Sequence, residues 1–266
     1  MTEKIPYRSM LCKDLDWAHV KYPCWVQPKL NGINARLWHG RLWTRDNKLF
    51  PLCVTEHILE LWKEWPRDVC VQGELYRHEW PLQRIMGACA QGRKEASENT
   101  YQIEFFVYDF CTLQTFHDRW QIYGNLPLKA TEICSHQCHA REDIERLHSS
   151  YLNQGYEGTI IRVPPCYYQF GRRSWNLMRW KPVKFMTVDV DGFGYGNLNT
   201  KYEHVMGYLT CRTPDGKYVN VGGGFSDKLR DAWCSLLTLP KSISIEYETL
   251  SENGVPLKPR FISKIS

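Results

Sequence analysis

One lysine attracts attention because of the residues around it. Lys29 lies in Gln27-Pro28-Lys29-Leu30-Asn31-Gly32, a short run that places one basic side chain close to a glycine. A neutral lysine amine is a good nucleophile toward phosphorus. A lysine considered alone is nevertheless usually a solvated surface residue, so the other polar groups of the chain decide between the two interpretations.

Five further polar segments follow Lys29 in order, each on or beside an apolar, strand-like run. They are Thr44-Arg45, Gly73-Glu74-Leu75, Phe106-Val107-Tyr108-Asp109, Glu157-Gly158 and Arg179-Trp180-Lys181. These segments add two carboxylates, several cations and aromatic side chains to the candidate nucleophile. Such groups are needed to hold a nucleotide and attack its phosphate.

The size and composition predict a folded, soluble protein. The 266 residues suffice for one large domain or for a medium and a small one. No apolar stretch approaches the roughly 20 residues that cross a bilayer, and the beginning of the sequence has no signal-peptide pattern. We therefore expect a cytoplasmic protein with no membrane partner.

The eleven cysteines are scattered and odd in number, with no Cys-x-x-Cys pair, which predicts reduced, mostly structural thiols. One local cluster, formed by Cys134, His136, Cys138 and His139, is too compressed for the usual zinc spacing. The net charge is +5, and from residue 189 onward nine basic residues balance nine acidic ones. The positive excess therefore lies in the first 188 residues, which suits a polyanionic partner.

Short alternating runs in the first part of the chain predict a β-rich domain with a few helices. A His39-Gly40 turn separates two of the predicted strands, and residues 81–97 form a polar, basic segment to which we assign no role. We expect helices at 54–65, with Trp62 and Trp65 apolar and Pro66 as the stop, and at 141–153, ending at Gly155. We expect strands at 24–30, 33–38, 41–45, 69–76, 103–110, 158–163 and 177–181.

The second part of the chain has a different pattern, with strands expected at 187–191, 205–212, 217–221 and 243–248 and one helix capped by Ser226. Several short strands and one helix in about eighty residues are typical of the five-stranded oligonucleotide-binding (OB) barrel. The predicted fold class is therefore α+β, with a mainly antiparallel domain at residues 1–187 and a small β-barrel domain at residues 188–266.

The ordered segments resemble the nucleotidyltransferase motifs of the ATP-dependent DNA ligases, a superfamily that includes RNA ligases and mRNA capping enzymes. The run Pro28–Gly32 is similar to the family's Lys-x-Asp-Gly motif, and the later segments follow in family order up to Pro182. Downstream, the run 221–227 followed by Arg230 resembles a segment of DNA-ligase barrel domains. Lys258-Pro259-Arg260-Phe261 resembles their C-terminal basic motif, and this pair favours a DNA ligase.

This resemblance implies a nucleotidyltransferase (adenylation) domain and three transfer steps. Lys29 would attack the α-phosphate of ATP, the AMP would move to a 5′-phosphate at a nick in duplex DNA, and the neighbouring 3′-hydroxyl would displace AMP. ATP and Mg²⁺ are the implied cofactors, and a monomer is expected. The implied catalytic residues are Lys29, Lys181, Glu74 and Glu157, with Glu157 and Glu74 as metal ligands.

The resemblance also implies a nucleotide-binding set. Gln27 would contact the adenine amino group, Phe106 or Tyr108 would stack on the base, and Glu74 would bind the ribose. Arg45 would bind phosphate, while Lys258 and Arg260 would reach the ATP phosphates from the second domain. The remaining implied contacts are Pro28, Leu30, Asn31, Arg36, Ile161, Arg179 and Lys181.

Three departures from the family pattern keep alternatives open. Asn31 replaces the usual Asp, Arg179 replaces a Lys, and Asn34 stands where many relatives have Arg, a contact for which Arg36 could substitute. Because Asn in the first motif also occurs among RNA ligases, an RNA ligase is the nearest alternative. A GTP-dependent capping enzyme and a non-catalytic OB protein that binds nucleic acid are the others.

Overall fold

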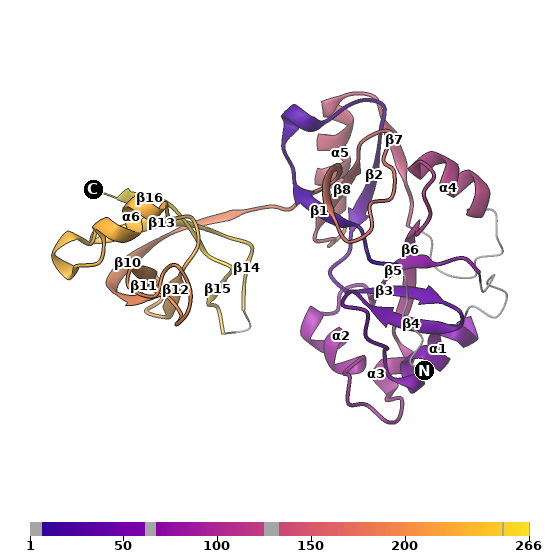
Figure 1. Cartoon of the computed structure of the whole chain (residues 1–266), viewed down its shortest axis with the longest axis horizontal. Helices are drawn as coiled ribbons and strands as arrows, with labels where there is room; N and C mark the ends of the chain where they lie inside the picture. The colour runs from indigo at the N-terminus through magenta and orange to yellow at the C-terminus, as the bar shows by residue number, and fades with distance from the viewer. Residues whose placement is uncertain (1–6, 62–67, 125–132, 252, 266) are drawn as a thin grey trace. The chain divides into compact units, whose positions relative to one another are not determined.

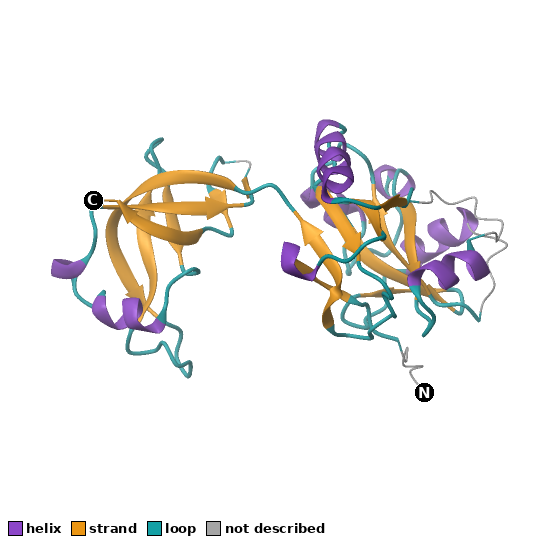
Figure 2. Cartoon of the chain, turned by 90° about the horizontal axis from the view of Figure 1, so that it is seen from above, coloured by secondary structure: helices purple, strands orange, loops and turns teal. Residues whose placement is uncertain are grey.

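The computed structural model describes residues 7–61, 68–124, 133–251 and 253–265. The chain divides into two compact units, Met1–Trp180 and Lys181–Ser266. This division lies seven residues before the predicted domain boundary, which falls inside the strand β10 (Lys184–Tyr195). Figures 1 and 2 show the strands of each unit and the helices that accompany them.

The first unit contains two sheets. One has the order β1-β9-β8-β2-β7, in which β1 and β9 are parallel and the other neighbours are antiparallel. The other has the antiparallel order β4-β3-β5-β6. Their strands are β1 (Leu11–Asp14), β2 (Cys24–Lys29), β3 (Ile33–Trp38), β4 (Arg41–Thr44), β5 (Val71–Tyr76), β6 (Glu104–Phe110), β7 (His136–Cys138), β8 (Gly158–Arg162) and β9 (Arg173–Trp180).

The helices cover the outer faces of these sheets. The longest of them, α5, packs against β8 and β2 through Ile144 and Tyr151 and is followed by Gly155, whose φ of 83° explains the glycine at this position. The helices are α1 (Leu52–Leu61), α2 (Leu82–Ala88), α3 (Glu98–Tyr101), α4 (Phe116–Tyr123) and α5 (Arg141–Asn153), with a 3₁₀ turn, η1 (Trp17–His19).

Apolar side chains from both sheets meet in the interior of the first unit. One buried cluster joins Met10, Trp43, Cys70, Tyr168 and Leu177, which come from the β1–β9 side and from the β4–β5 side. This packing fixes the inner faces of the sheets against each other, which is where the polar segments of the sequence meet.

Most of the strands predicted for the first unit are confirmed to within a few residues, as is the helix at 141–153. The helix expected at 54–65 is present as α1, but Trp62, Trp65 and Pro66 lie outside the described residues. Among the described elements of the first unit, β1, the short edge strand β7, the helices α3 and α4 and the turn η1 were not predicted. Residues 81–97, the polar, basic segment of the sequence, contain the short helix α2.

The second unit is a five-stranded sheet with the order β12-β11-β10-β13-β16 and one helix. Its elements are β10, β11 (Met206–Arg212), β12 (Tyr218–Val221), α6 (Asp227–Ala232), a 3₁₀ turn η2 (Leu236–Thr238), β13 (Ser242–Tyr247), β16 (Arg260–Ile265) and the small pair β14 (Thr249–Leu250) and β15 (Pro256–Leu257). The Ser226 hydroxyl accepts a hydrogen bond from the Leu229 amide, so the predicted helix cap is confirmed.

The predicted fold class is confirmed, with one correction in the second unit: the described strands do not close into a barrel by a continuous ladder. The edges β12 and β16 meet at a single bridge between Gly223 and Arg260, where the Phe261 amide donates to the Gly223 carbonyl at 2.9 Å. The cause lies in the segment after β12, where Gly224 has a φ of 89° and the chain turns toward α6 instead of extending the strand.

Among the described residues, no helix has the length and apolar character needed to cross a membrane.

Candidate active site

A cavity of about 200 Å³ lies where the two sheets of the first unit face each other. Its wall includes residues from β1, β2, β8 and β9 on one side and from β3, β5 and β6 on the other. The lining residues are Ser9, Met10, Leu11, Cys12, Gln27, Pro28, Lys29, Leu30, Asn34, Arg45, Gln72, Glu74, Tyr108, Asp109, Ile133, Ile160, Arg162, Arg173, Leu177 and Arg179.

Lys29 is the last residue of β2 and pairs with Gly158 of β8. Its ammonium forms an ion pair with the Glu157 carboxylate and donates to the Leu30 carbonyl at 3.2 Å. The two charged side chains are 18% and 20% exposed, so this pair is largely shielded from water. The first and fifth of the six predicted segments therefore meet beside the cavity.

Gly32 is required by the close approach of β5. A Cβ atom at this position would lie 2.4 Å from the Leu75 carbonyl oxygen and 2.7 Å from Cγ of Glu74. Any other residue would push β5, and Glu74 with it, away from Lys29. The close packing of β5 thus explains why a glycine is present at position 32 in the first segment.

Glu74 projects from β5 into the cavity wall and is half-buried. Burial raises its pKa to about 7, against the opposing effects of the Lys29 charge and of hydrogen bonds from the Gly32 backbone and the Tyr108 side chain. The neighbouring Glu157 carboxylate raises the pKa further. Near neutral pH this carboxyl group is therefore poised to exchange a proton or to accept a cation.

Tyr108 is held in the wall by its hydroxyl group. Asn34 donates to this oxygen, and Gln72 donates to it at 3.2 Å. The Asn34 carbonyl in turn accepts from the Ser9 hydroxyl at 2.7 Å, and burial raises the pKa of Tyr108 well above its ordinary value. The ring is thus a neutral, fixed surface beside Glu74.

A β-bulge brings Tyr108 and Asp109 to the same cavity. The pairing of β5 with β6 shifts by one residue, because Gln72 pairs with Asp109 and Gly73 pairs with Val107, which leaves Tyr108 as the extra residue. In a regular strand adjacent side chains point to opposite faces, and a bulge changes their direction. It also leaves the Tyr108 carbonyl available to other donors.

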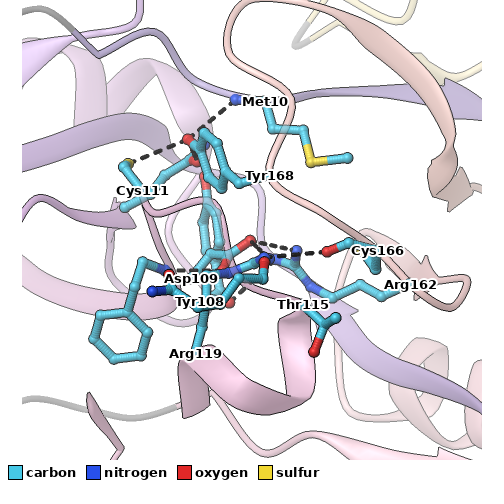
Figure 3. Close-up of polar contacts among 12 residues, drawn as sticks. Met10, Tyr108, Asp109, Cys111, Thr115, Arg119, Arg162, Cys166 and Tyr168 are labelled. Carbon is cyan, nitrogen blue, oxygen red and sulfur yellow. Dashed lines mark hydrogen bonds and ion pairs between the residues drawn. The ribbon is translucent and has the colours of Figure 1, made fainter. Parts of the chain in front are cut away.

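A buried ion network lies beneath this wall (Figure 3). The Asp109 carboxylate accepts from Arg119 at 2.7 and 3.0 Å and from Arg162 at 2.6 Å, and the three side chains are at most 2% exposed. Arg119 comes from α4 and Arg162 from the end of β8, as Figure 3 shows. Burying charges is tolerable only when they are paired in this way.

Gln27 connects that network to the cavity. Its Oε1 accepts from Nε of Arg162 at 2.8 Å, and its Nε2 donates to Ser135 Oγ at 2.8 Å and to the Tyr108 carbonyl at 3.3 Å. Arg162 is the last residue of β8. The structure gives it a buried position with three acceptors.

Three more arginines line the cavity toward its polar rim. Arg179 donates to Asp14 at 2.6 Å, and Arg173 donates to the Cys12 carbonyl. Arg45 is exposed, and within the described part of the chain no hydrogen bond or ion pair is assigned to it. Cations at this rim suit an anionic ligand such as a polyphosphate.

Eight of the predicted site residues line the cavity, and Glu157 joins them through Lys29. The eight are Gln27, Pro28, Lys29, Leu30, Arg45, Glu74, Tyr108 and Arg179. Their juxtaposition follows from the structure, whereas the role of each in binding or catalysis remains a prediction.

Of the nucleotide contacts predicted in the first unit, four do not line the cavity in the described structure. Ile161 is fully buried in the core beneath α5, because its neighbour Ile160 takes the cavity face of β8. Phe106 packs edge-on against Tyr76, and Asn31 is exposed. Arg36 requires a fuller correction.

Arg36 does not substitute for the arginine missing at Asn34. Its guanidinium is fully buried and donates to the carbonyl of Tyr7, to the carbonyl of Thr44 at 2.5 Å and to Asn47 at 2.7 Å. Because these backbone acceptors occupy it, Arg36 ties the N-terminal segment to the turn after β4. The proposed phosphate contact is wrong.

Lys181 and the two C-terminal basic residues belong to the second unit, where carboxylates hold them. Glu248 accepts from Lys181 at 3.1 Å and from Lys258 at 2.8 Å, and Arg260 lies 3.6 Å from Glu246. β9 ends at Trp180, one residue before the end of the predicted strand 177–181, so Lys181 lies outside the strand. The proposed reach of these residues toward ATP stays a prediction.

The Cys134–His139 segment makes one polar contact of note, 3.3 Å between Cys134 Sγ and His136 Nε2. Cys138 is buried in the core under α5. No group of three or more His, Cys, Asp or Glu side chains in the described residues is arranged to hold a metal ion.

The sequence interpretation overlooked the N-terminal wall, Ser9 to Cys12, as well as Gln72, Asp109 and Ile133. Asp109 carried a usable signal, because an acidic residue in an apolar strand needs a buried partner. The partner, Arg119, is ten residues further along the chain, and its pairing with Asp109 could not be predicted from the sequence.

Comparisons with known proteins agree with this picture. Residues 199–263 match the family described as DNA ligase OB-like domain. A DNA ligase of African swine fever virus (isolate Pig/Kenya/KEN-50/1950) is 26% identical over 270 residues, which cover 89% of this chain and 62% of the viral protein. The chain therefore spans about three fifths of the length of this curated relative.

Two solved structures show the same fold over nearly all of the chain. One is from a structure-function analysis of Lig E DNA ligases, described as DNA binding with a minimal scaffold. It has a TM-score of 0.81 and 23% sequence identity, and the match covers 98% of this chain and 100% of that one. The other is the Chlorella virus DNA ligase-adenylate, with a TM-score of 0.57, 22% identity and 98% coverage of both chains. The family match, the viral relative and the shared fold confirm the resemblance of this chain to DNA ligases.

Proposed function

We propose that this chain is an ATP-dependent DNA ligase that seals nicks through a lysyl-AMP intermediate on Lys29. The observation that carries the proposal is the position of the Lys29 amine at a cavity whose wall also contains Glu74, Tyr108 and Arg45. A nucleophile, a carboxylate, an aromatic ring and a phosphate-binding cation are thereby available to one nucleotide. The structure of the Chlorella virus ligase-adenylate supports the same chemistry.

The Lys29 amine must lose its proton before it can attack. With an ordinary lysine pKa of roughly 10.4, deprotonation near pH 7.5 costs about 4 kcal/mol. The attacking amine must also leave its ion pair with the Glu157 carboxylate.

The two carboxylates fit a magnesium ion that arrives with the nucleotide. Mg²⁺ is usually held by one or two carboxylates together with substrate phosphates. Glu157 lies close enough to Glu74 to raise the pKa of Glu74. Such a raised pKa is expected when two carboxylates lie together without enough positive charge to balance them. When bound, Mg²⁺ would screen the charge of the triphosphate.

The proposed substrate is duplex DNA with a nick that carries a 5′-phosphate and a 3′-hydroxyl. The contacts would be mainly to phosphates, with strong salt dependence and little sequence preference. We further propose that the protein acts as a monomer in the cytoplasm.

The test is a sealing assay with ATP and magnesium on nicked duplexes whose 3′ and 5′ ends are deoxyribose or ribose. A DNA ligase seals the all-deoxyribose nick efficiently. Preferential sealing of ribose ends would favour the RNA ligase that Asn31 leaves open. Tight binding without sealing of any duplex would leave a nucleic-acid-binding protein.

A further inference from the structure

The side chain of Gln27 has most of its hydrogen-bonding groups occupied by protein partners, which leaves one acceptor site for a ligand. A glutamine amide has two N–H donors and two acceptor lone pairs on oxygen. Ser135 and the Tyr108 carbonyl take the two donors, at 2.8 and 3.3 Å, and Arg162 takes one lone pair at 2.8 Å. One acceptor lone pair of Oε1 is left, on a residue that lines the cavity.

Arg162 prevents the amide from turning over. Arginine donates hydrogen bonds and cannot accept them, so the atom facing Nε of Arg162 must be the amide oxygen. The strand register explains the contact, because Gln27 pairs with Ile160 and Trp25 pairs with Arg162. Gln27 and Arg162 are therefore diagonal neighbours on one face of adjacent strands, within reach of long side chains.

The Arg162 guanidinium is itself immobilised. It donates to Asp109 at 2.6 Å and to the Tyr108 carbonyl at 3.1 Å, and Arg119 holds Asp109 from the opposite side through two bonds. Arg119 is not among the described residues that line the cavity, and it holds the cavity-lining Asp109 through these two bonds. Figure 3 shows the two arginines converging on this carboxylate.

We propose that Arg162 is a positioning residue that selects adenine over guanine nucleotides by fixing the orientation of the Gln27 amide. The remaining acceptor site on this cavity-lining side chain matches the 6-amino donor of adenine. Guanine presents a carbonyl oxygen at that position, and two facing acceptors repel each other. This inference rests on the proposed function, because it concerns the nucleotide that Lys29 attacks.

The test uses the full chain and measures kcat/KM for covalent labelling of the protein by α-labelled ATP and by α-labelled GTP. In Arg162→Lys, one ammonium cannot serve Asp109, Tyr108 and Gln27 together, so the ATP-to-GTP ratio is expected to fall about tenfold. Gln27→Met is expected to lower the ratio by a similar factor. The double variant should show no further fall, because both changes remove the same acceptor.

Arg119→Lys is the matched control, since it weakens the same ion network away from the cavity. It is expected to lower the melting temperature and to change the ratio much less than Arg162→Lys does, because a lysine can still pair with Asp109 and Arg162 keeps its bonds to Gln27 and to the Tyr108 carbonyl. An unchanged ratio in Gln27→Met overturns the proposal, even if Arg162→Lys does not fold. An equal fall in Arg119→Lys also overturns it, because the effect would then be a general loosening.

The two proposals fail in different ways. If the wild-type chain takes label from neither nucleotide, the ligase assignment fails and this inference falls with it. If the wild-type chain takes label from ATP and the variants keep its preference, the ligase assignment stands and only the role of Arg162 is rejected.

Discussion

The ionisation of Glu74 is governed by its place in the wall of the cavity. Burial raises its pKa from an ordinary value near 4.5 to about 7, despite the Lys29 charge nearby. Between these two pH values the folded protein binds a proton that the unfolded chain releases. Stability must therefore fall as the pH rises through this window.

Glu74→Gln removes that dependence. We expect the variant to be more stable than the wild type by about 1–2 kcal/mol at about pH 8, because no carboxylate has to be buried there. At about pH 5 the difference should largely disappear, since the wild-type group is then protonated when folded. Thermal unfolding across this range without nucleotide checks the prediction, and a gap that is independent of pH would contradict it.

Arg36 and Arg45 are both arginines that sequence reasoning placed on phosphates, yet their surroundings differ completely. Arg36 is buried among carbonyl acceptors, whereas Arg45 is exposed at the cavity. Removing a buried donor leaves its acceptors unsatisfied, and removing an exposed one does not.

We therefore expect Arg36→Met to lose about 2–4 kcal/mol of unfolding free energy and to keep ATP labelling per folded molecule. Arg45→Met should change stability by less than about 0.5 kcal/mol and weaken labelling. Denaturant unfolding paired with labelling at low temperature separates the two. A stable Arg36→Met protein that no longer binds ATP would restore the phosphate role rejected above.

At the level of strands and helices, much of the fold could be predicted from local patterns. Alternating apolar residues placed β2, β3, β5, β6 and β8, and the Gly155 and Ser226 signals placed the ends of two helices. The bulge at Tyr108 could not be predicted, because it arises from pairing with a strand some thirty residues away. The position of Asp109 at the cavity depends on this bulge, and the burial of Ile161 follows from Ile160 facing the cavity on β8.

The helix α6 shows why the run 221–230 of the second unit has its particular residues. Arg230 is buried and donates to the carbonyls of Met206, Gly207 and Gly222 at 2.9, 2.7 and 2.7 Å. These acceptors lie on β11 and just after β12. The arginine thus ties the helix to the part of the sheet where the strand ladder stays open.

Arg230→Met is expected to lower the stability of the second unit by about 2–4 kcal/mol and to speed amide hydrogen exchange in β11 and β12. Ser226→Ala removes only the helix cap and should cost about 1 kcal/mol. Hydrogen exchange resolved by residue makes the comparison. Unchanged protection of β12 in Arg230→Met would show that the arginine is dispensable for the sheet.

On the scale of the whole molecule, the two units hold different parts of the proposed machinery. The cavity belongs to the first unit, while Lys181, Lys258 and Arg260 belong to the second, where Glu248 and Glu246 neutralise them. Glu248 is buried enough to oppose ionisation, but hydrogen bonds from Lys258 and Lys181 lower its pKa. Local sequence patterns identified these lysines but gave no information about their ion-pair partner, Glu248.

Lys258 is expected to serve only the first chemical step, since it would contact the phosphates that leave as pyrophosphate. Lys258→Met should therefore reduce ATP labelling about tenfold or more and leave the sealing of a pre-adenylated nick unchanged. Lys264→Met, on the neighbouring strand β16, is the control and should affect neither step. Equal loss of both steps in Lys258→Met would point to a general role in DNA binding.

The central claim is that the amine of Lys29 carries the adenylyl group. Incubation with α-labelled ATP and magnesium, followed by digestion and mass spectrometry, would locate the modified residue. We expect AMP on the peptide that contains Lys29, and no adduct in Lys29→Ala although that variant remains folded. An adduct on any other residue, or one that persists in Lys29→Ala, would contradict the account.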